Sequence, residues 1–213
     1  RLYPNATIHA FSRNRRFATS DDHVIDYLDE ISLSNCALLA ADDGPLDCVC
    51  ILVGLLHSDT IQPERSIKGL NVDQLTELFR VNTIIPTMIA KHFLPYLNKQ
   101  SRSILALLSA RIGSISDNKV GGWYGDRSSK AALNMIIKTL SIEATRLSKQ
   151  HIVIGLHPGT VDTALSRPYH RFVDPKKIAS PESAAENLSH ILMNVEVSNT
   201  GNCVAWDGSI IAP

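Results

Sequence analysis

The chain has 213 residues, of which 21 are basic and 21 acidic, so its formal net charge is +0. This balance gives no sign of nucleic acid or an anionic membrane surface as a partner. Hydrophobic residues make up 44% of the chain, which is enough for the core of one large α/β domain. No apolar run approaches the ~20 residues of a membrane-spanning helix, and no secretory signal peptide is visible.

Short apolar runs alternate along the chain with longer segments of helical periodicity. Strands are predicted at residues 7–11, 23–27, 47–53, 104–108, 152–156 and 203–206. Several of these runs are almost continuously apolar, which is typical of strands buried on both faces of a parallel sheet. The alternation predicts an α/β fold, a Rossmann-type doubly wound parallel sheet in three layers (α/β/α), and one domain over residues 1–213.

Four helices are predicted between these strands. One covers residues 30–40, a second begins at Asn71 with Gln74 as a capping-box partner, a third follows Asp126, and a fourth opens at Ser180, where Pro181 suits the first turn. Asp126 is itself a favourable N-cap, and its charge suits a helix N-terminus.

The four cysteines are Cys36, Cys48, Cys50 and Cys203, which fits a reducing compartment. Cys48 and Cys50 are two positions apart in an apolar run, so they should point to the same face of a strand, as ordinary buried thiols. No His/Cys spacing resembles a zinc site, and no metal is expected.

Several stretches together resemble a known family. They are Asp26 with its neighbours, Val53-Gly54, Asn82, and residues 108–114, 121–134 and 157–163. They are similar to the short-chain dehydrogenase/reductase family, and most of all to its C-factor-like and carbonyl-reductase-like bacterial branch. The resemblance covers most of the chain and implies hydride transfer between a nicotinamide cofactor and a small-molecule carbonyl or alcohol.

In that family a tyrosine exchanges the proton, and a lysine one helical turn later lowers the tyrosine pKa. Lys130 matches the lysine, but Asp126 stands in the place of the tyrosine. An aspartate ends several bonds short of a tyrosine hydroxyl, starts from a pKa of ~3.9, and should be held ionised by Lys130. Capping or pairing with Lys130 is therefore the alternative role for Asp126. Tyr124 is another candidate acid, although it lies two residues too early.

The family serine that binds the reacting oxygen has no simple counterpart. Ala110 occupies its position, with Ser109 and Ser114 on either side, and Ser114 is the better substitute. Ile51 stands where this branch usually has asparagine.

Asn82 matches the family asparagine that helps to hold a proton-relay water. Pro86, four residues later, lacks the N–H that would bond to the carbonyl of residue 82, which leaves that carbonyl free for water. The alternative is a simple proline kink.

The resemblance also implies a cofactor site. Asp26 would contact the adenine ring, Thr163 would hold the nicotinamide carboxamide, and Arg13 would pair with the 2′-phosphate of NADP, although a solvated basic loop explains Arg13 equally well. The remaining cofactor-binding candidates are Gly54, Lys130, Pro158, Gly159 and Val161. NADP is the expected cofactor, and NAD remains an alternative.

Two hypotheses of different class follow. The first is a cytoplasmic NADP-dependent oxidoreductase, intact or impaired, that forms a homodimer or homotetramer through the helices at Asn71 and Asp126. The second is a non-catalytic C-factor-like signalling or binding protein on the same scaffold. Asn82 and Lys130 favour the enzyme, whereas Asp126, Ile51 and Ala110 favour the rival.

The family fold has a further strand and a glycine-rich turn that bind the cofactor pyrophosphate. That strand would lie between the predicted strands at 7–11 and 47–53, and the sequence contains neither feature. We therefore expect the natural gene to encode about 20–30 more residues before Arg1, since a missing central strand leaves unpaired backbone groups at two buried edges. Without them, dinucleotide binding should be weak or absent.

Overall fold

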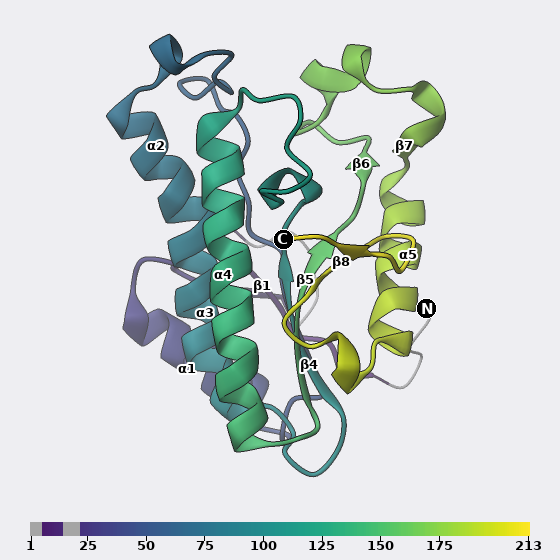
Figure 1. The fold of residues 1–213 in the computed structure, drawn as a ribbon. Coiled ribbons are helices and arrows are strands. Elements are labelled where there is room, and N and C mark those ends of the chain that lie inside the picture. The colour runs from purple at the N-terminus through teal and green to yellow at the C-terminus, as the bar shows by residue number, and fades with distance from the viewer. Residues whose placement is uncertain (1–5, 15–21) are drawn as a thin grey trace.

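The structure, a computed structural model, describes residues 6–14 and 22–213. Its main sheet has five strands in the order β3-β4-β5-β8-β9 (Figure 1). The strands are β3 (Cys48–Ile51), β4 (Ser103–Leu108), β5 (His151–His157), β8 (Cys203–Ala205) and β9 (Ile210–Ile211). The first four are parallel and β9 is antiparallel to β8, so the predicted Rossmann-type parallel sheet is confirmed.

Two further strand pairs lie outside this sheet. β1 (Ala10–Ser12) pairs with β2 (Asp22–Val24), and β6 (Thr160–Val161) pairs with β7 (Ile178–Ala179), both in parallel. All six predicted strands are therefore present, whereas β6, β7 and β9 are too short for an apolar run to predict. Within the described ranges no ladder joins β1 to β3, and the expected strand between them remains a prediction.

Helices cover both faces of the main sheet, as Figure 1 shows. The α-helices are α1 (Glu30–Ala40), α2 (Val72–Phe79), α3 (Ile85–Phe93), α4 (Tyr124–Leu147) and α5 (Pro181–Asn194). Short 3-10 helices occupy Ile67–Gly69, Leu94–Tyr96, Arg111–Gly113, Arg167–Phe172, Pro175–Lys177 and Val197–Asn199. The predicted N-caps Asn71 and Ser180 are confirmed, because their side chains accept backbone N–H bonds from the first turns of α2 and α5.

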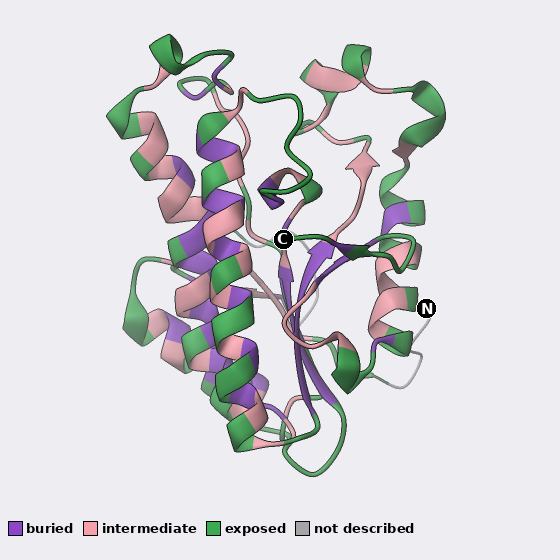
Figure 2. Cartoon of the chain, viewed as in Figure 1, coloured by how far each residue is buried: buried purple, intermediate pink, exposed green. Residues whose placement is uncertain are grey.

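Alternate residues of β4 and β5 divide the core in two. Leu105, Leu107 and Val153 pack with α1, α3 and α4 on one face, whereas Ile104 and Ile154 pack with α5 on the other. Side chains of successive strand residues point to opposite faces, so a continuously apolar strand fills both cores. Figure 2 shows these strands as the most deeply buried part of the chain.

The long helix predicted from Asn71 is irregular in its middle. A π-helix over Arg80–Ile84 separates α2 from α3, and the Ile85 N–H donates to the Arg80 carbonyl. Pro86 follows directly, and proline cannot donate the next backbone bond of a regular α-helix. The irregular turn carries Asn82, which the sequence selects as a functional residue.

Cys48 and Cys50 share one face of β3, with their Sγ atoms 3.7 Å apart. Their predicted burial is wrong, because both residues are exposed. The reason is that β3 is the outer strand of the five-stranded sheet, and no described element covers this face.

In the described part of the chain, no helix is long and apolar enough to cross a membrane.

Candidate active site

The predicted residues Gly54, Asn82 and Lys130 gather beyond the carboxyl ends of the parallel strands β3 and β4. A Cβ atom added to Gly54 would lie 3.6 Å from Lys130 Nζ and 3.7 Å from Asn82 Oδ1. Lys130 comes from α4 and Asn82 from the π-helix, so three separate segments meet at this point. Such a position, outside the strand ends of an open α/β sheet, is where this class of fold binds ligands.

Asn82 joins these segments through its side chain. Its Oδ1 accepts the Leu55 N–H at 2.7 Å, and its Nδ2 donates to the Leu55 carbonyl at 2.9 Å and to Ser129 Oγ at 3.1 Å. Asn82 is fully buried, so each of these bonds satisfies a group that water cannot reach. The side chain therefore fixes the loop after β3 against α4, while the role of its backbone carbonyl remains a prediction.

Lys130 is buried, with 6% of its surface exposed, and its Nζ donates to the Leu108 carbonyl at 2.8 Å. Burial lowers its pKa to about 8, and the nearby Asp126 carboxylate opposes that shift. An ammonium group has three N–H donors, so two remain for other partners. Lys130 thus presents a fixed positive charge beside Gly54.

Asp126 is also buried, at 8% exposure, in the first turn of α4. Its burial raises its pKa to about 6, although Lys130 and Arg127 pull the value down. Desolvation of the carboxylate thus outweighs the attraction of the ammonium, yet a carboxyl with a pKa of about 6 is still mostly ionised at pH 7. Among the described residues, the two side chains form no ion pair within 4 Å.

The start of α4 also differs from the prediction. The helix begins at Tyr124, three residues earlier than expected, and its N-cap is Trp123 in the left-handed conformation (φ 50°) rather than Asp126. Glu64 performs the capping from a distant loop: its Oε2 accepts the Gly125 N–H at 3.2 Å, and its carbonyl accepts the Trp123 N–H. Sequence reasoning missed Glu64, because nothing near it in the chain marks a cap that lies 61 positions away.

Gly125 allows this close approach. An added Cβ would lie 2.5 Å from Leu78 Cδ1 and 3.0 Å from Glu64 Oε1. We predict that Gly125→Ala lowers the free energy of unfolding by about 1–3 kcal/mol through overpacking, as measured by urea denaturation. The exposed helix position Ser128→Ala is the control, and equal stability of the two variants would contradict the predicted clash.

The serine candidates both have partners. Ser114 is buried and its Oγ accepts the Asp117 N–H at 3.1 Å, whereas Ser109 Oγ donates to Asn134 Oδ1 at 2.6 Å. Ala110 caps the 3-10 helix between them. Tyr124 is the first residue of α4 and is 38% exposed. The structure thus places all of these residues around the N-terminal half of α4.

The segment after β5 carries most of the predicted cofactor residues. Gly159 follows Pro158 with a φ of 76°, and an added Cβ would lie 3.0 Å from Trp206 Cδ1. Both features require glycine. Val161 pairs with Ala179 in the small sheet, and the Thr163 carbonyl accepts two backbone N–H bonds from the following turn.

Arg13 and Asp26 lie apart from these residues in the chain, after β1 and β2 respectively. Arg13 is exposed. Asp26 Oδ1 accepts the Leu28 N–H at 2.9 Å, which forms a local turn before α1. No described contact joins either residue to Lys130, and their cofactor roles remain predictions. The described residues also contain no cluster of potential metal ligands.

No model of a known protein family matches the sequence. The chain is 28% identical over 192 residues to 1-hydroxy-2-glutathionyl-2-methyl-3-butene dehydrogenase of Rhodococcus sp. strain AD45, covering 88% of this chain and 77% of that protein. It is 32% identical over 94 residues to C-signal of Myxococcus xanthus, covering 44% of this chain and 55% of that protein.

Solved structures show the same fold at lower identity. Carbonyl reductase Sniffer of D. melanogaster has a TM-score of 0.82 at 23% identity, covering 99% of this chain and 90% of that chain. NADPH-bound carbonyl reductase from chicken fatty liver has a TM-score of 0.76 at 21% identity, covering 91% and 78% respectively. The resemblance inferred from the sequence motifs is thereby confirmed.

Proposed function

We propose that this chain, whose sequence and fold resemble those of carbonyl-reductase-like short-chain dehydrogenases/reductases, is an NADP-dependent oxidoreductase. It would reduce a small carbonyl compound or oxidise the corresponding alcohol. The observation that carries the proposal is the buried Lys130 ammonium, held by the Leu108 carbonyl beside Gly54 and Asn82. A buried charge is costly, and an arrangement that fixes one at the strand ends is typical of a functional site.

The residues present suit a nicotinamide nucleotide. Gly54 carries no side chain of its own beside Lys130 and Asn82, and the Lys130 ammonium has donors to spare for ribose hydroxyls. Thr163 would hold the carboxamide, and Pro158, Gly159 and Val161 would shape the same wall. The nucleotide, when bound, supplies or accepts the hydride.

The chain's own residues would manage the proton and the reacting oxygen. Asp126, with a pKa of about 6, can hold a proton close to neutral pH and release it again. Lys130 stabilises negative charge that develops nearby. Ser114 is the candidate to bind the reacting oxygen, in place of the serine that Ala110 replaces.

The direct test, on the full product of the natural gene, is NADPH titration by fluorescence, followed by a panel of aldehydes and ketones. We expect binding and measurable reduction, and Lys130→Met should abolish turnover. NADPH binding without turnover of any carbonyl would instead support a non-catalytic protein. That second candidate is favoured by Asp126, Ile51 and Ala110 and by the similarity to C-signal.

Cofactor choice yields a separate prediction. If Arg13 contacts the 2′-phosphate, Arg13→Ala should weaken NADPH binding about ten- to a hundredfold, because a lost charge-assisted hydrogen bond costs ~1.5–3 kcal/mol. NADH binding should hardly change, since NADH lacks that phosphate. Titrations with both nucleotides check this, and an equal loss for both would refute the assignment. Lys119→Ala, at another exposed position, is the control.

Self-association and location complete the proposal. Val72 of α2 is 73% exposed, and Met135 and Ile142 of α4 are 66% and 50% exposed. Apolar side chains on two neighbouring helices favour contact with another copy of the chain, as a homodimer or homotetramer. We propose that the protein acts in the cytoplasm, where free thiols persist.

A further inference from the structure

We propose that Tyr169 supplies the hydroxyl that binds the substrate's carbonyl oxygen and donates the proton to it. It would do so from the segment after β5, in place of the tyrosine that α4 lacks. This inference rests on the proposed function and assigns a catalytic residue that the sequence motifs do not reveal.

Residues from two other segments flank the Tyr169 ring. Trp123, at the start of α4, meets it edge-on with ring centroids 4.8 Å apart and an interplanar angle of 62°. His57, from the loop after β3, lies 5.8 Å away at 67°, and its Nε2 donates to the Leu165 carbonyl at 3.0 Å. Edge-to-face packing of this kind orients an aromatic ring. The ring is therefore anchored beside the first turn of α4.

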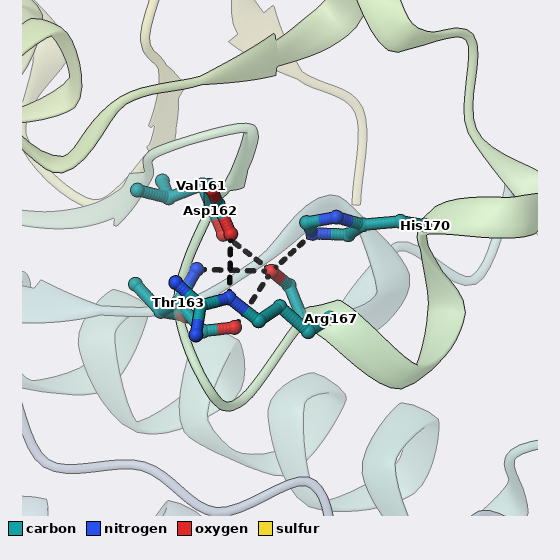
Figure 3. A network of polar contacts seen from close by, with 6 residues as sticks. Val161, Asp162, Thr163, Arg167 and His170 are labelled. Carbon is teal, nitrogen blue, oxygen red and sulfur yellow. Dashed lines mark hydrogen bonds and ion pairs between the residues drawn. The ribbon is translucent and has the colours of Figure 1, made fainter.

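The segment that carries Tyr169 is itself braced, as Figure 3 shows. Ser166 Oγ lies 2.8 Å from His170 Nε2 and donates to the Val161 carbonyl, and Arg167 Nε donates to Asp162 Oδ1 at 2.9 Å. These contacts tie the 3-10 helix at Arg167–Phe172 back to the turn after β6. A side chain on such a frame can keep a defined position relative to α4.

The Tyr169 hydroxyl is buried and has no hydrogen-bond partner among the described residues. An unsatisfied buried hydroxyl costs about 1–3 kcal/mol, so it marks a place where a ligand acceptor would bind favourably. Burial and the negative charge of Asp126 both raise the pKa of Tyr169, so the phenol stays protonated at neutral pH. The hydroxyl is thus a donor without an acceptor, on a ring that packs against Trp123 at the start of α4.

In the proposed reaction Tyr169 would be the acid that completes carbonyl reduction. The carbonyl carbon gains a hydride from the reduced nicotinamide of NADPH, the C=O π electrons move to the oxygen, and that oxygen takes the proton of the Tyr169 O–H. The products are the alcohol and oxidised nicotinamide. The Asp126 carboxylate would then take up a proton from water and pass it to the Tyr169 phenolate, which restores both groups.

Tyr169→Phe tests this assignment, since it removes only the hydroxyl. We expect kcat for carbonyl reduction to fall about 10²–10⁴-fold, with NADPH affinity unchanged. Tyr96→Phe is the matched control, because Tyr96 packs against the core near α1 and α3. Unchanged turnover in Tyr169→Phe would overturn the proposal. A loss of kcat in Tyr124→Phe but not in Tyr169→Phe would overturn it as well, because Tyr124 would then be the acid. If the wild-type chain reduces no carbonyl at all, the proposed function fails first.

A second measurement does not depend on turnover. Phenolate formation can be followed by ultraviolet difference titration. We expect one tyrosine to ionise above the ordinary tyrosine pKa, and this ionisation step should be missing from the titration of Tyr169→Phe. In Asp126→Asn the same tyrosine should ionise at lower pH, because the nearby negative charge is gone. An unaltered titration in both variants would show that Tyr169 does not face Asp126 and would overturn the proposal.

Discussion

In a chain that carries Tyr169→Phe, adding Asp126→Tyr should raise the turnover of a carbonyl substrate by about 10²–10⁴-fold, the usual contribution of a positioned acid–base group. The phenol would extend several bonds further than the carboxylate, from the first turn of α4 and one turn before Lys130. The Lys130 ammonium would lower the phenol pKa and so make it a better acid than Tyr169, whose pKa is raised. The gain should appear in kcat, with little change in NADPH affinity.

Asp126→Phe is the control for this experiment, because it adds the same ring without the hydroxyl. If Asp126→Tyr brings no gain in the Tyr169→Phe chain, although NADPH binds well, the non-catalytic protein is favoured instead. Adding Ala110→Ser should give more than the two single effects combined, since the acid and the oxygen-binding group act as a unit. In the Asp126→Tyr background, Tyr169→Phe should lose most of its effect, because the new hydroxyl replaces the old one.

The parallel sheet could be predicted because its strands carry their own signal. β4 and β5 are apolar at almost every position, which suits burial on both faces, and the six predicted runs all form strands. Helix starts were predictable where the cap is local, as at Asn71 and Ser180. The start of α4 was not, since its cap is Glu64, a residue far away in the chain.

The residues of the candidate site also differ in whether the sequence alone could identify them. Lys130, Asn82 and Gly54 could be selected from motifs, and the structure brings them together. Tyr169 belongs to no motif, and its place beside Trp123 depends on how the segment after β5 folds back. The spacing of four residues in the sequence indicates that Lys130 lies one helical turn from Asp126, but it does not indicate that both side chains are buried. Burial is the larger cause of both pKa shifts, so their directions could not be predicted from the sequence.

That burial has a consequence for stability. The pKa of Asp126 rises from an ordinary 3.8 to about 6 in the folded chain, so the folded state binds a proton more tightly than the unfolded state. Stability from this group is then fully present below pH ~4 and is lost as the pH rises to about 6. The loss amounts to about 3 kcal/mol, at ~1.4 kcal/mol for each pKa unit. Lys130, with a pKa of about 8, stays charged in both states across this window and adds no slope.

Asp126→Asn should therefore stabilise the protein at pH 7 by up to about 3 kcal/mol and have almost no effect at pH 4, where the wild-type carboxyl is protonated. Urea denaturation at a series of pH values measures the difference, which should grow between pH 4 and pH 6 and then level off. Asp59→Asn, at an exposed position, should show no such trend. A constant difference across the pH range would mean that Asp126 is not desolvated as the structure indicates.

The same Asp126→Asn variant should turn over carbonyls more slowly, because an amide cannot return a proton to Tyr169. A buried charge that lowers the stability of the fold but supports turnover is typical of a catalytic site.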